Sequence, residues 1–209
     1  MTAMAMNLEM IHPLAAVASY RDPALGSHLV RIGFYCRTIA QRLQLPADVQ
    51  ELLFKAAPMH DLGKLAVPDF ILSKQDRLDE AEFAIVKRHT IIGHELLKDS
   101  RSTTLRTAAL IALTHHERYD GTGYPHRLKG NEIPLLGRIC AVGDVFDALI
   151  SDRPYKKAWS IDRAVGEIAT QAGTQFDPRV VEAFYGALPD LLRLLGRYPD
   201  DRLRVCSAV

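Results

Sequence analysis

The sequence is poor in cysteine and tryptophan, and it has no excess of charge of either sign. Its 209 residues include three cysteines and one tryptophan, and the formal net charge is +1. Three widely spaced cysteines are typical of reduced thiols and do not form a disulfide framework. Balanced charge argues against a protein that coats nucleic acid and against a polybasic membrane anchor. We therefore expect no DNA or RNA polymer as a partner.

Long hydrophobic runs are also missing. No apolar stretch approaches the roughly 20 residues that cross a bilayer, so we expect no membrane contact. The first residues lack a basic segment and His12-Pro13 interrupts their apolar stretch, so we expect no cleaved signal peptide. Together with the cysteine pattern, these absences predict a cytoplasmic protein.

Alternating β patterns are scarce, whereas apolar residues recur every three or four positions along most of the chain. Turn formers and capping residues separate these periodic segments. The pattern predicts helices over residues 28–43, 47–60, 79–98, 102–117 and 134–150, with further helices opening at 160 and 178 and a short one at 189. We therefore expect an all-α bundle of roughly eight to ten helices.

The chain is long enough for one domain with a sizeable core. It contains no low-complexity run and no Gly/Ser linker. We expect a lead-in segment or helix over 1–20, one main domain over 21–187, and a C-terminal helix and tail over 188–209.

The segment His60-Asp61-Leu62-Gly63-Lys64 ends an apolar helix. A carboxylate has two oxygens and can bridge two cations, whereas a neutral imidazole binds one. The segment also fits a plain helix end that Gly63 closes, with His60 and Lys64 facing the helix dipole. Both interpretations stay open on this segment alone.

Two further sets of histidines follow at helix positions. His115 and His116 end the apolar run 108–113, and His89 precedes Gly93 by one turn. Buried imidazoles without partners are costly, which favours a ligand role, and a glycine at that spacing lets another backbone approach. The alternatives are an exposed pair at a frayed helix end and an ordinary surface histidine at His89.

Acids inside an apolar helix are the next unusual feature. Asp144 and Asp147 share one face of the segment 141–150, where an acid is costly unless it is paired or bound to metal. A buried capping or ion pair would also explain them. His28 lies on an apolar helix stripe, where a lone histidine is more often structural.

Taken together, these residues come from five separate helical segments that can converge in one bundle core. Imidazole and carboxylate without cysteine suit iron, manganese or zinc. Seven ligands exceed one octahedron, so the pattern predicts two metals bridged by Asp61, an arrangement that clamps the oxygens of phosphoryl transfer. Asp147 is expected to orient a ligand histidine. The expected ligands are His28, His60, Asp61, His89, His115, His116 and Asp144.

The order H…HD…H…HH…D resembles the HD superfamily of metal-dependent phosphohydrolases. The stretch from His115 to Pro125, HHERYDGTGYP, resembles the signature of the HD-GYP subgroup. The segments 60–64, 67–74 and 143–156 also look like the motifs of that subgroup, and the resemblance covers about residues 22–185. It implies an HD-domain helical bundle with a metal site in its core.

The resemblance further implies a bacterial phosphodiesterase that linearises the second messenger cyclic di-GMP to pGpG, and in some members continues to GMP. Two divalent metals are implied, and iron and manganese fit the ligands equally well. The resemblance gives His28, His60, Asp61 and Asp144 to one metal. Asp61 then bridges to a second metal, which the resemblance gives to His89, His115 and His116. A hydroxide between the metals is expected to attack phosphorus, with Asp61 and Lys64 as catalytic residues.

Substrate contacts are implied in the same way. Lys64 resembles the family lysine that contacts the scissile phosphate, and Arg153 and Lys156 resemble the pair that grips phosphate and guanine. The loop Gly123-Tyr124-Pro125 is implied to shape the entrance, with Tyr124 at the substrate. In some members this loop contacts diguanylate cyclase domains. Whether the chain forms a homodimer is left open.

One departure from the family pattern bears on the metal count. Some members carry a glutamate four residues before the first histidine, which supports a third metal, and Ala24 stands there in this chain. We therefore expect two metals. Two alternatives stay open: hydrolysis of 3′,3′-cyclic GMP-AMP or another nucleotide, and a non-catalytic module that recruits a partner through the loop around Tyr124.

Overall fold

A computed structural model describes residues 23–152 and 157–199. Within these ranges the chain forms nine α-helices and three 3₁₀-helices, with no strand beyond an isolated bridge between Ala172 and Phe176. The prediction of an all-α bundle is confirmed. The α-helices are α2 (Pro23–Arg42), α3 (Ala47–Ala56), α4 (Asp69–Leu72), α5 (Glu80–Lys87), α6 (His89–Leu97), α7 (Thr103–Thr114), α8 (Leu135–Ile150), α9 (Ile161–Thr170) and α10 (Pro178–Arg197). The 3₁₀-helices are η1 (Ala57–Met59), η2 (Leu62–Ala66) and η3 (Gly130–Glu132).

Short polar side chains begin several of these helices. Asp79 accepts a hydrogen bond from the backbone N–H of Glu82, whose carboxylate in turn accepts from the N–H of Asp79, so α5 opens with a capping box. Ser160 caps α9, as the sequence predicts, and Asp177 caps α10 with Pro178 in its first turn. These local signals therefore place the helix starts correctly.

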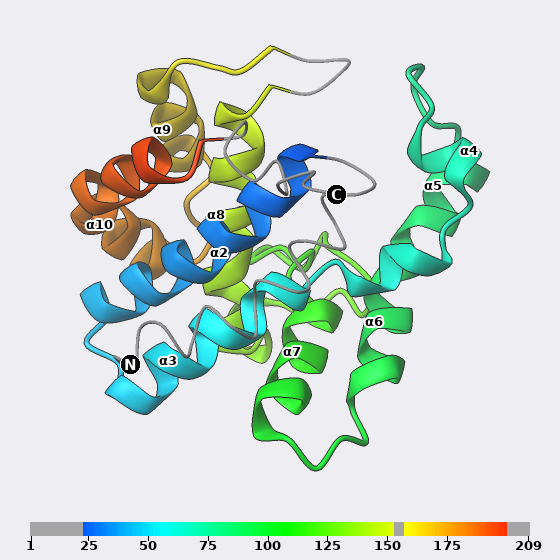
Figure 1. Cartoon of the computed structure of the whole chain (residues 1–209), viewed down its shortest axis with the longest axis horizontal. Helices are drawn as coiled ribbons and strands as arrows, with labels where there is room; N and C mark the ends of the chain where they lie inside the picture. Colours follow the sequence, from blue (N-terminus) through cyan, green and yellow to red (C-terminus); the bar gives the residue numbers. More distant parts are fainter. Residues whose placement is uncertain (1–22, 153–156, 200–209) are drawn as a thin grey trace, which may run out of the picture.

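The helices form one bundle with a projecting arm. α2 packs against α3, α8 and α10, and α9 packs on α8. α6 and α7 form an antiparallel pair beneath, while α4 and α5 extend away from the bundle (Figure 1). Between α3 and α4, the 3₁₀-helices η1 and η2 pack against α2, α6 and α7.

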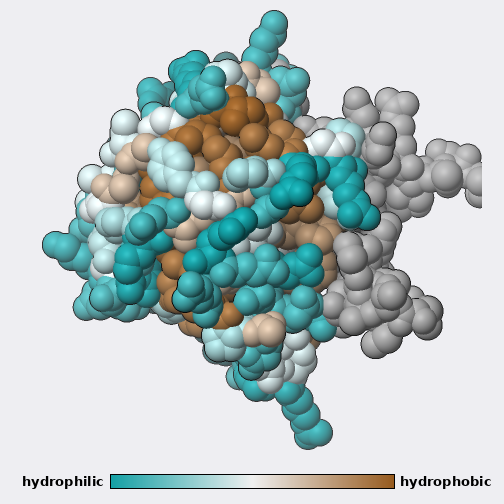
Figure 2. All heavy atoms as spheres, turned by 90° about the vertical axis from the view of Figure 1, so that its left-hand side faces the viewer, coloured by the Kyte–Doolittle hydropathy of each residue, from teal (hydrophilic) through white to brown (hydrophobic). Residues whose placement is uncertain are grey.

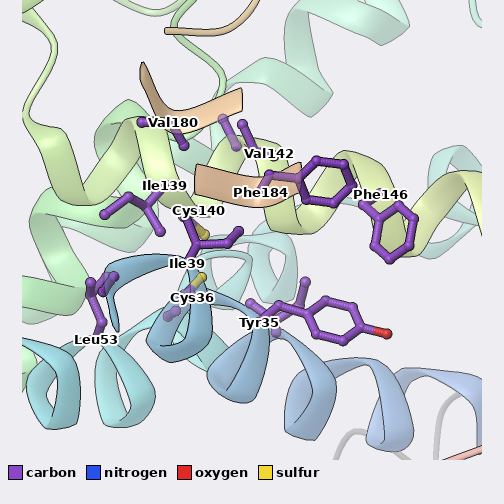
Figure 3. Close-up of a cluster of buried hydrophobic side chains, with 14 of the residues drawn as sticks. Tyr35, Cys36, Ile39, Leu53, Ile139, Cys140, Val142, Phe146, Val180 and Phe184 are labelled. Carbon is purple, nitrogen blue, oxygen red and sulfur yellow. The ribbon is translucent and has the colours of Figure 1, made fainter. Parts of the chain in front are cut away.

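The main core lies where α2, α8 and α10 meet. Tyr35, Cys36 and Ile39 on α2 face Ile139, Cys140 and Phe146 on α8, with Phe184 from α10 beside them (Figure 3). All are buried. Since removing apolar surface from water contributes roughly 25 cal/mol per Å², this contact holds α2 and α8 in register, and both helices carry site residues.

The predicted helix over 79–98 is wrong as one element, because the chain breaks at Arg88 into α5 and α6. The ring of His89 bonds the backbone carbonyl of Val86 (Nδ1–O 2.7 Å). A side chain that bonds nearby backbone competes with the helical ladder. The break therefore coincides with a site residue.

The predicted helix start at Pro189 is also wrong, because α10 runs through that proline to Arg197. A proline inside a helix costs about 3 kcal/mol. Phe184 and Ala187 before it and Leu191 after it are all buried in the same core, and this packing continues the helix. The expected divisions at residues 20 and 187 stay predictions, and residues 1–22 and 200–209 lie outside the described ranges.

The described helices include none long and apolar enough to cross a bilayer. On the side of α9 and α10, hydrophilic side chains surround a hydrophobic area toward the top of the view (Figure 2). Large apolar side chains with more than a third of their surface exposed gather elsewhere. Apart from Tyr185 on α10, those among the described residues all lie between residues 65 and 96, on η2, the arm and α6.

The contact between α2 and α3 depends on a glycine. A Cβ added at Gly33 would lie 2.7 Å from the backbone oxygen of Phe54. Backbone cannot move aside as a flexible side chain can, so the two helices approach this closely only because residue 33 has no side chain.

We expect Gly33→Ala to lower the free energy of unfolding by about 1–3 kcal/mol, because the added methyl overpacks the α2–α3 contact. Gly166→Ala is the matched control: it lies on α9, where a Cβ would meet nothing within 4 Å. That change should raise stability by about 0.5–1 kcal/mol through helix propensity. Urea unfolding of both variants checks this, and equal shifts of one sign would contradict the packing argument.

Candidate metal centre

The structure brings all seven predicted ligands into two adjoining groups at the centre of the bundle. Their nitrogen and oxygen atoms lie within 4.8 Å of one another inside each group. One group consists of His28, His60 and Asp144, and the other of Asp61, His89, His115 and His116. The ligands come from α2, the η1–η2 turn, the start of α6, the end of α7 and α8.

Asp61 lies between the two groups and offers one oxygen to each. Its Oδ2 lies 3.4 Å from Nε2 of His60, and its Oδ1 lies 3.3 Å from Nε2 of His89. On the other side of His60, Oδ1 of Asp144 lies 3.6 Å from Nε2 of both His60 and His28. This is the arrangement expected of a carboxylate that bridges two cations.

Backbone carbonyls accept hydrogen bonds from the outer ring nitrogen of three of the histidines. Nδ1 of His60 lies 2.9 Å from the carbonyl oxygen of Ala57, and Nδ1 of His115 lies 3.0 Å from the carbonyl oxygen of Ala112. His89 makes the equivalent bond to Val86. Since carbonyls only accept, Nδ1–H is the donor, and Nε2 is the ring atom that points into the cluster. This tautomer and orientation are those of metal-binding histidines.

Two inward atoms have no hydrogen-bond partner among the described residues. Nε2 of His60 and Oδ1 of Asp61 are both buried in this state. A buried polar atom without a partner costs about 1–3 kcal/mol. A divalent cation would satisfy both atoms, and imidazole with carboxylate suits iron, manganese or zinc. The residues therefore fit a divalent metal.

The surroundings also keep three of the ligands deprotonated. Burial, reinforced by the nearby His115, lowers the pKa of His89 to about 4 and holds the pKa of His116 well below its usual value. Burial alone would raise the pKa of Asp61, but Lys64 and His60 outweigh it and hold it well below its usual range. These groups need not lose a proton at neutral pH before they bind a cation.

His60 is the exception. Burial disfavours its charged form, but the Asp61 carboxylate outweighs burial and raises the pKa of His60 to about 10. A cation in this group would take the place of that proton, so its binding releases a proton from His60.

The predicted substrate residues have different positions. Lys64 lies at the cluster, with Nζ 2.5 Å from Oδ2 of Asp61. The ring of Tyr124 lies 4.9 Å from the ring of His116, between centroids. Arg153 and Lys156 lie outside the described residues. Lys64 and Tyr124 are therefore next to the ligands, and their roles stay predictions.

Asp147, expected from the sequence to orient a ligand histidine, is hydrogen-bonded to His28. Its Oδ2 lies 2.8 Å from Nδ1 of His28. Burial opposes ionisation of Asp147, but hydrogen bonds from Arg31 and His28 outweigh it and lower its pKa to about 2. The carboxylate stays charged and holds the imidazole.

Sequence reasoning missed Arg31, whose side chain is fully buried. Its Nε and Nη2 lie 2.6 and 2.8 Å from the two oxygens of Asp147, and Nη1 donates to the carbonyl of Tyr198. The available signal was an arginine one turn after His28, on the same apolar helix. Arg31 thus links the C-terminal end of α10 to the support of a ligand.

Glu117 was missed as well. Its buried carboxylate accepts hydrogen bonds from the backbone N–H groups of His126 (2.7 Å) and Leu128 (3.1 Å). A Cβ at Gly123 would lie 2.3 Å from the backbone nitrogen of Arg118, so the loop folds back on the end of α7. These contacts hold Tyr124 beside His116. The feature of the sequence that could have indicated Glu117 is its position directly after the His115-His116 pair.

Two glycines bring the turn after Asp61 onto α6. A Cβ at Gly63 would lie 2.0 Å from the backbone oxygen of His89 and 2.6 Å from the nitrogen of Gly93. The close approach of another backbone segment, which Gly93 suggested, is therefore present. It places the turn that carries Asp61 against the start of α6, which carries His89.

We expect Arg31→Met to lower the free energy of unfolding by about 3–5 kcal/mol, because it removes one partner of a buried ion pair. Arg42→Met is the matched control, since it breaks the exposed pair of Arg42 with Asp190, which is worth under about 1 kcal/mol. Arg31→Lys, which keeps the charge without the planar fork, should fall between them. Guanidinium unfolding measures all three, and a loss no larger than that of Arg42→Met would contradict this account.

Known proteins are similar to this chain over most of its length. The model of the family described as HD domain matches residues 13–180. The cyclic di-GMP phosphodiesterase response regulator RpfG of Xanthomonas campestris is 44% identical over 91% of this chain and 50% of its own length. The 3′3′-cGAMP-specific phosphodiesterase 2 of Vibrio cholerae is 38% identical over 92% of this chain and 37% of its length. The chain thus spans about half or less of these curated relatives.

Solved structures agree on the fold. Bd1817, an HDG"Y"P protein from Bdellovibrio bacteriovorus, aligns with a TM-score of 0.62 at 21% identity, over 78% of this chain and 51% of its own. The PgpH HD domain of L. monocytogenes, solved in complex with cyclic-di-AMP, aligns with a TM-score of 0.56 at 20% identity, over 90% of this chain and 98% of its own.

Proposed function

The chain belongs to the HD-domain family, and from that premise we propose that it is a cyclic di-GMP phosphodiesterase with two divalent metals, iron or manganese. The observation that carries the proposal is the Asp61 carboxylate, which offers one oxygen to each of two ligand groups. All seven predicted ligands are present, which argues against a non-catalytic module. The product is pGpG, with further cleavage to GMP open.

The metal assignment follows the two groups. His28, His60 and Asp144 would hold one cation, and His89, His115 and His116 would hold the other, with Asp61 shared between the two groups. Two such cations supply an activated water and neutralise charge on the phosphate. This proposal is supported by Nε2 of His60 and Oδ1 of Asp61, two buried inward atoms without a hydrogen-bond partner among the described residues.

The protein's own groups position the substrate. Lys64 lies beside the Asp61 carboxylate with its side chain 39% exposed, and it turns to a phosphate oxygen of the bound diester. Arg153 and Lys156 grip the phosphates and a guanine, as the family resemblance implies. Tyr124 closes the entrance next to His116. An ammonium gives a point charge, whereas a guanidinium gives a fork that matches phosphate.

A second substrate is favoured by a specific observation. Relatives that span most of this chain include 3′3′-cGAMP-specific phosphodiesterases at 38% and 37% identity, close to the values for the cyclic di-GMP enzymes. We therefore keep 3′3′-cGAMP as the alternative. Contact of the Gly123-Tyr124-Pro125 loop with diguanylate cyclase domains, a homodimer and a place in the bacterial cytoplasm are further parts of the proposal.

The test combines metal analysis with turnover. Anaerobically purified protein should hold about two metal ions per chain and convert cyclic di-GMP to pGpG, as followed by chromatography. Asp61→Ala should lose the activity, while Asp162→Ala, an exposed acid on α9, should keep it. Metal without turnover of either cyclic dinucleotide would contradict the proposal and favour a binding module.

The two groups should also be separable. We expect His116→Ala to reduce the bound metal to about one ion per chain and to abolish turnover, because it removes a ligand of one group only. Replacing His94, which bonds the carbonyl of Ala109 away from the cluster, should leave the metal content unchanged. Full loss of metal from His116→Ala would show that the groups do not bind independently.

A further inference from the structure

A groove runs between the α5–α6 junction and the loop over residues 121–127. Its volume is about 620 Å³, within the range of pockets that hold small ligands. Phe83, Lys87 and Arg88 line one wall, and Tyr124 and Arg127 line the other. None of the seven metal-ligand candidates is among its lining residues, so the groove is a separate feature of the surface.

The groove is strongly basic. Lys87, Arg88 and Arg127 all line it, and no aspartate or glutamate does so among the described residues. Within residues 23–152 and 157–199, none of these three cations forms an ion pair with a carboxylate. Three cations without a local counter-charge favour an anionic ligand.

The groove is also aromatic. Phe83 is 45% exposed, although large apolar side chains are usually buried. Its ring stands at 82° to that of Tyr124, with the centroids 6.1 Å apart. Nζ of Lys87 lies 5.1 Å from the centroid of Phe83 and 6.0 Å from that of Tyr124. An exposed ring beside a cation is a surface on which nucleobases stack.

The groove joins the metal centre at two points. The ring of Tyr124 contacts that of His116, and Lys87 and Arg88 directly precede His89 in the chain. A ligand with its phosphate at the metals could therefore continue past Tyr124 into the groove without leaving the protein surface.

We propose that this groove binds the half of the cyclic dinucleotide that lies away from the reacting phosphate. Its purine base stacks on the ring of Phe83 and turns an edge toward Tyr124, because the two rings are nearly perpendicular. Its phosphate is neutralised by Lys87, Arg88 and Arg127. This inference rests on the proposed function, whose substrate carries a second base and a second phosphate. Phe83, Lys87, Arg88 and Arg127 are thereby substrate-binding residues that do not touch the reacting phosphate.

The groove contributes only to substrates that reach it. A small diester such as bis(p-nitrophenyl) phosphate has neither a purine nor a second phosphate, so it uses the metal centre alone. A change in the groove should therefore alter the KM for a cyclic dinucleotide and leave the small diester unaffected. A fold defect or a disturbed metal centre would alter both.

The test compares metal-loaded variants of the full chain on cyclic di-GMP, or on 3′3′-cGAMP if only that is turned over, and on bis(p-nitrophenyl) phosphate. Phe83→Ala should raise the KM for the cyclic dinucleotide about tenfold, the size of a lost base–aromatic contact, with kcat/KM for the small diester unchanged. Phe83→Trp should restore the KM. Arg88→Ala combined with Arg127→Ala should raise the KM and weaken its dependence on salt.

Tyr185→Ala is the matched aromatic control, because Tyr185 is similarly exposed (42%) but lies on α10, and Arg101→Ala is the exposed arginine control. Unchanged KM values in the groove variants, or equal losses on both substrates, would overturn the inference while leaving the proposed function intact. A wild-type protein that cleaves the small diester but neither cyclic dinucleotide would refute the proposed function, and the inference with it.

Discussion

The gathering of five imidazoles and two carboxylates in one cluster, with four of the imidazoles buried, is the constraint on which the rest of the structure depends. Buried polar atoms must be paired, or they cost free energy. Here the outer nitrogens of His60, His89 and His115 are paired with carbonyls of their own helix ends, while the inner atoms face one another. Free carbonyls of this kind occur at helix ends, and η1, α5 and α7 all end at the cluster. The glycine contact between Gly63 and His89 has the same origin, since only bare backbone lets Asp61 and His89 approach.

A buried ion pair between Arg31 and Asp147 supports this cluster through the ring of His28. Arg31 and Asp147 are buried together and do not face the metal ligands directly, except through His28. A buried pair of this kind contributes little net stability but fixes geometry, because either partner alone would be a buried charge. Since Arg31 also binds the carbonyl of Tyr198 and the hydroxyl of Ser151, it ties α2, α8 and the end of α10 to the orientation of one imidazole.

The sequence predicts the helices well where apolar periodicity and caps agree, as at Ser160, Asp177 and the α2 stripe. It predicts the ligand set through residue chemistry and the HD-GYP motifs, and the structure brings those residues together. It fails at Arg88 and Pro189, where tertiary contacts decide: the His89 ring takes a backbone carbonyl in one case, and core packing spans a proline in the other. Arg31 and Glu117 could not be assigned, because the burial of a charged side chain shows only once its partners are known. These partners are Asp147 for Arg31, and the backbone N–H groups of His126 and Leu128 for Glu117.

The break between α5 and α6 at Arg88 has a role that the apolar periodicity of the sequence does not indicate. An unbroken helix over 79–98 would place successive residues about 100° apart, and Lys87, Arg88 and His89 would spread around one cylinder. With the break, the backbone turns so that His89 is fully buried at the metal centre while Lys87 and Arg88 line the groove beside Phe83. The same short junction therefore carries a metal ligand and the cations proposed to hold the far half of the substrate. A change that straightens it would disturb both the metal centre and the groove, whereas a change of side chain at residue 83 or 88 alters the groove alone.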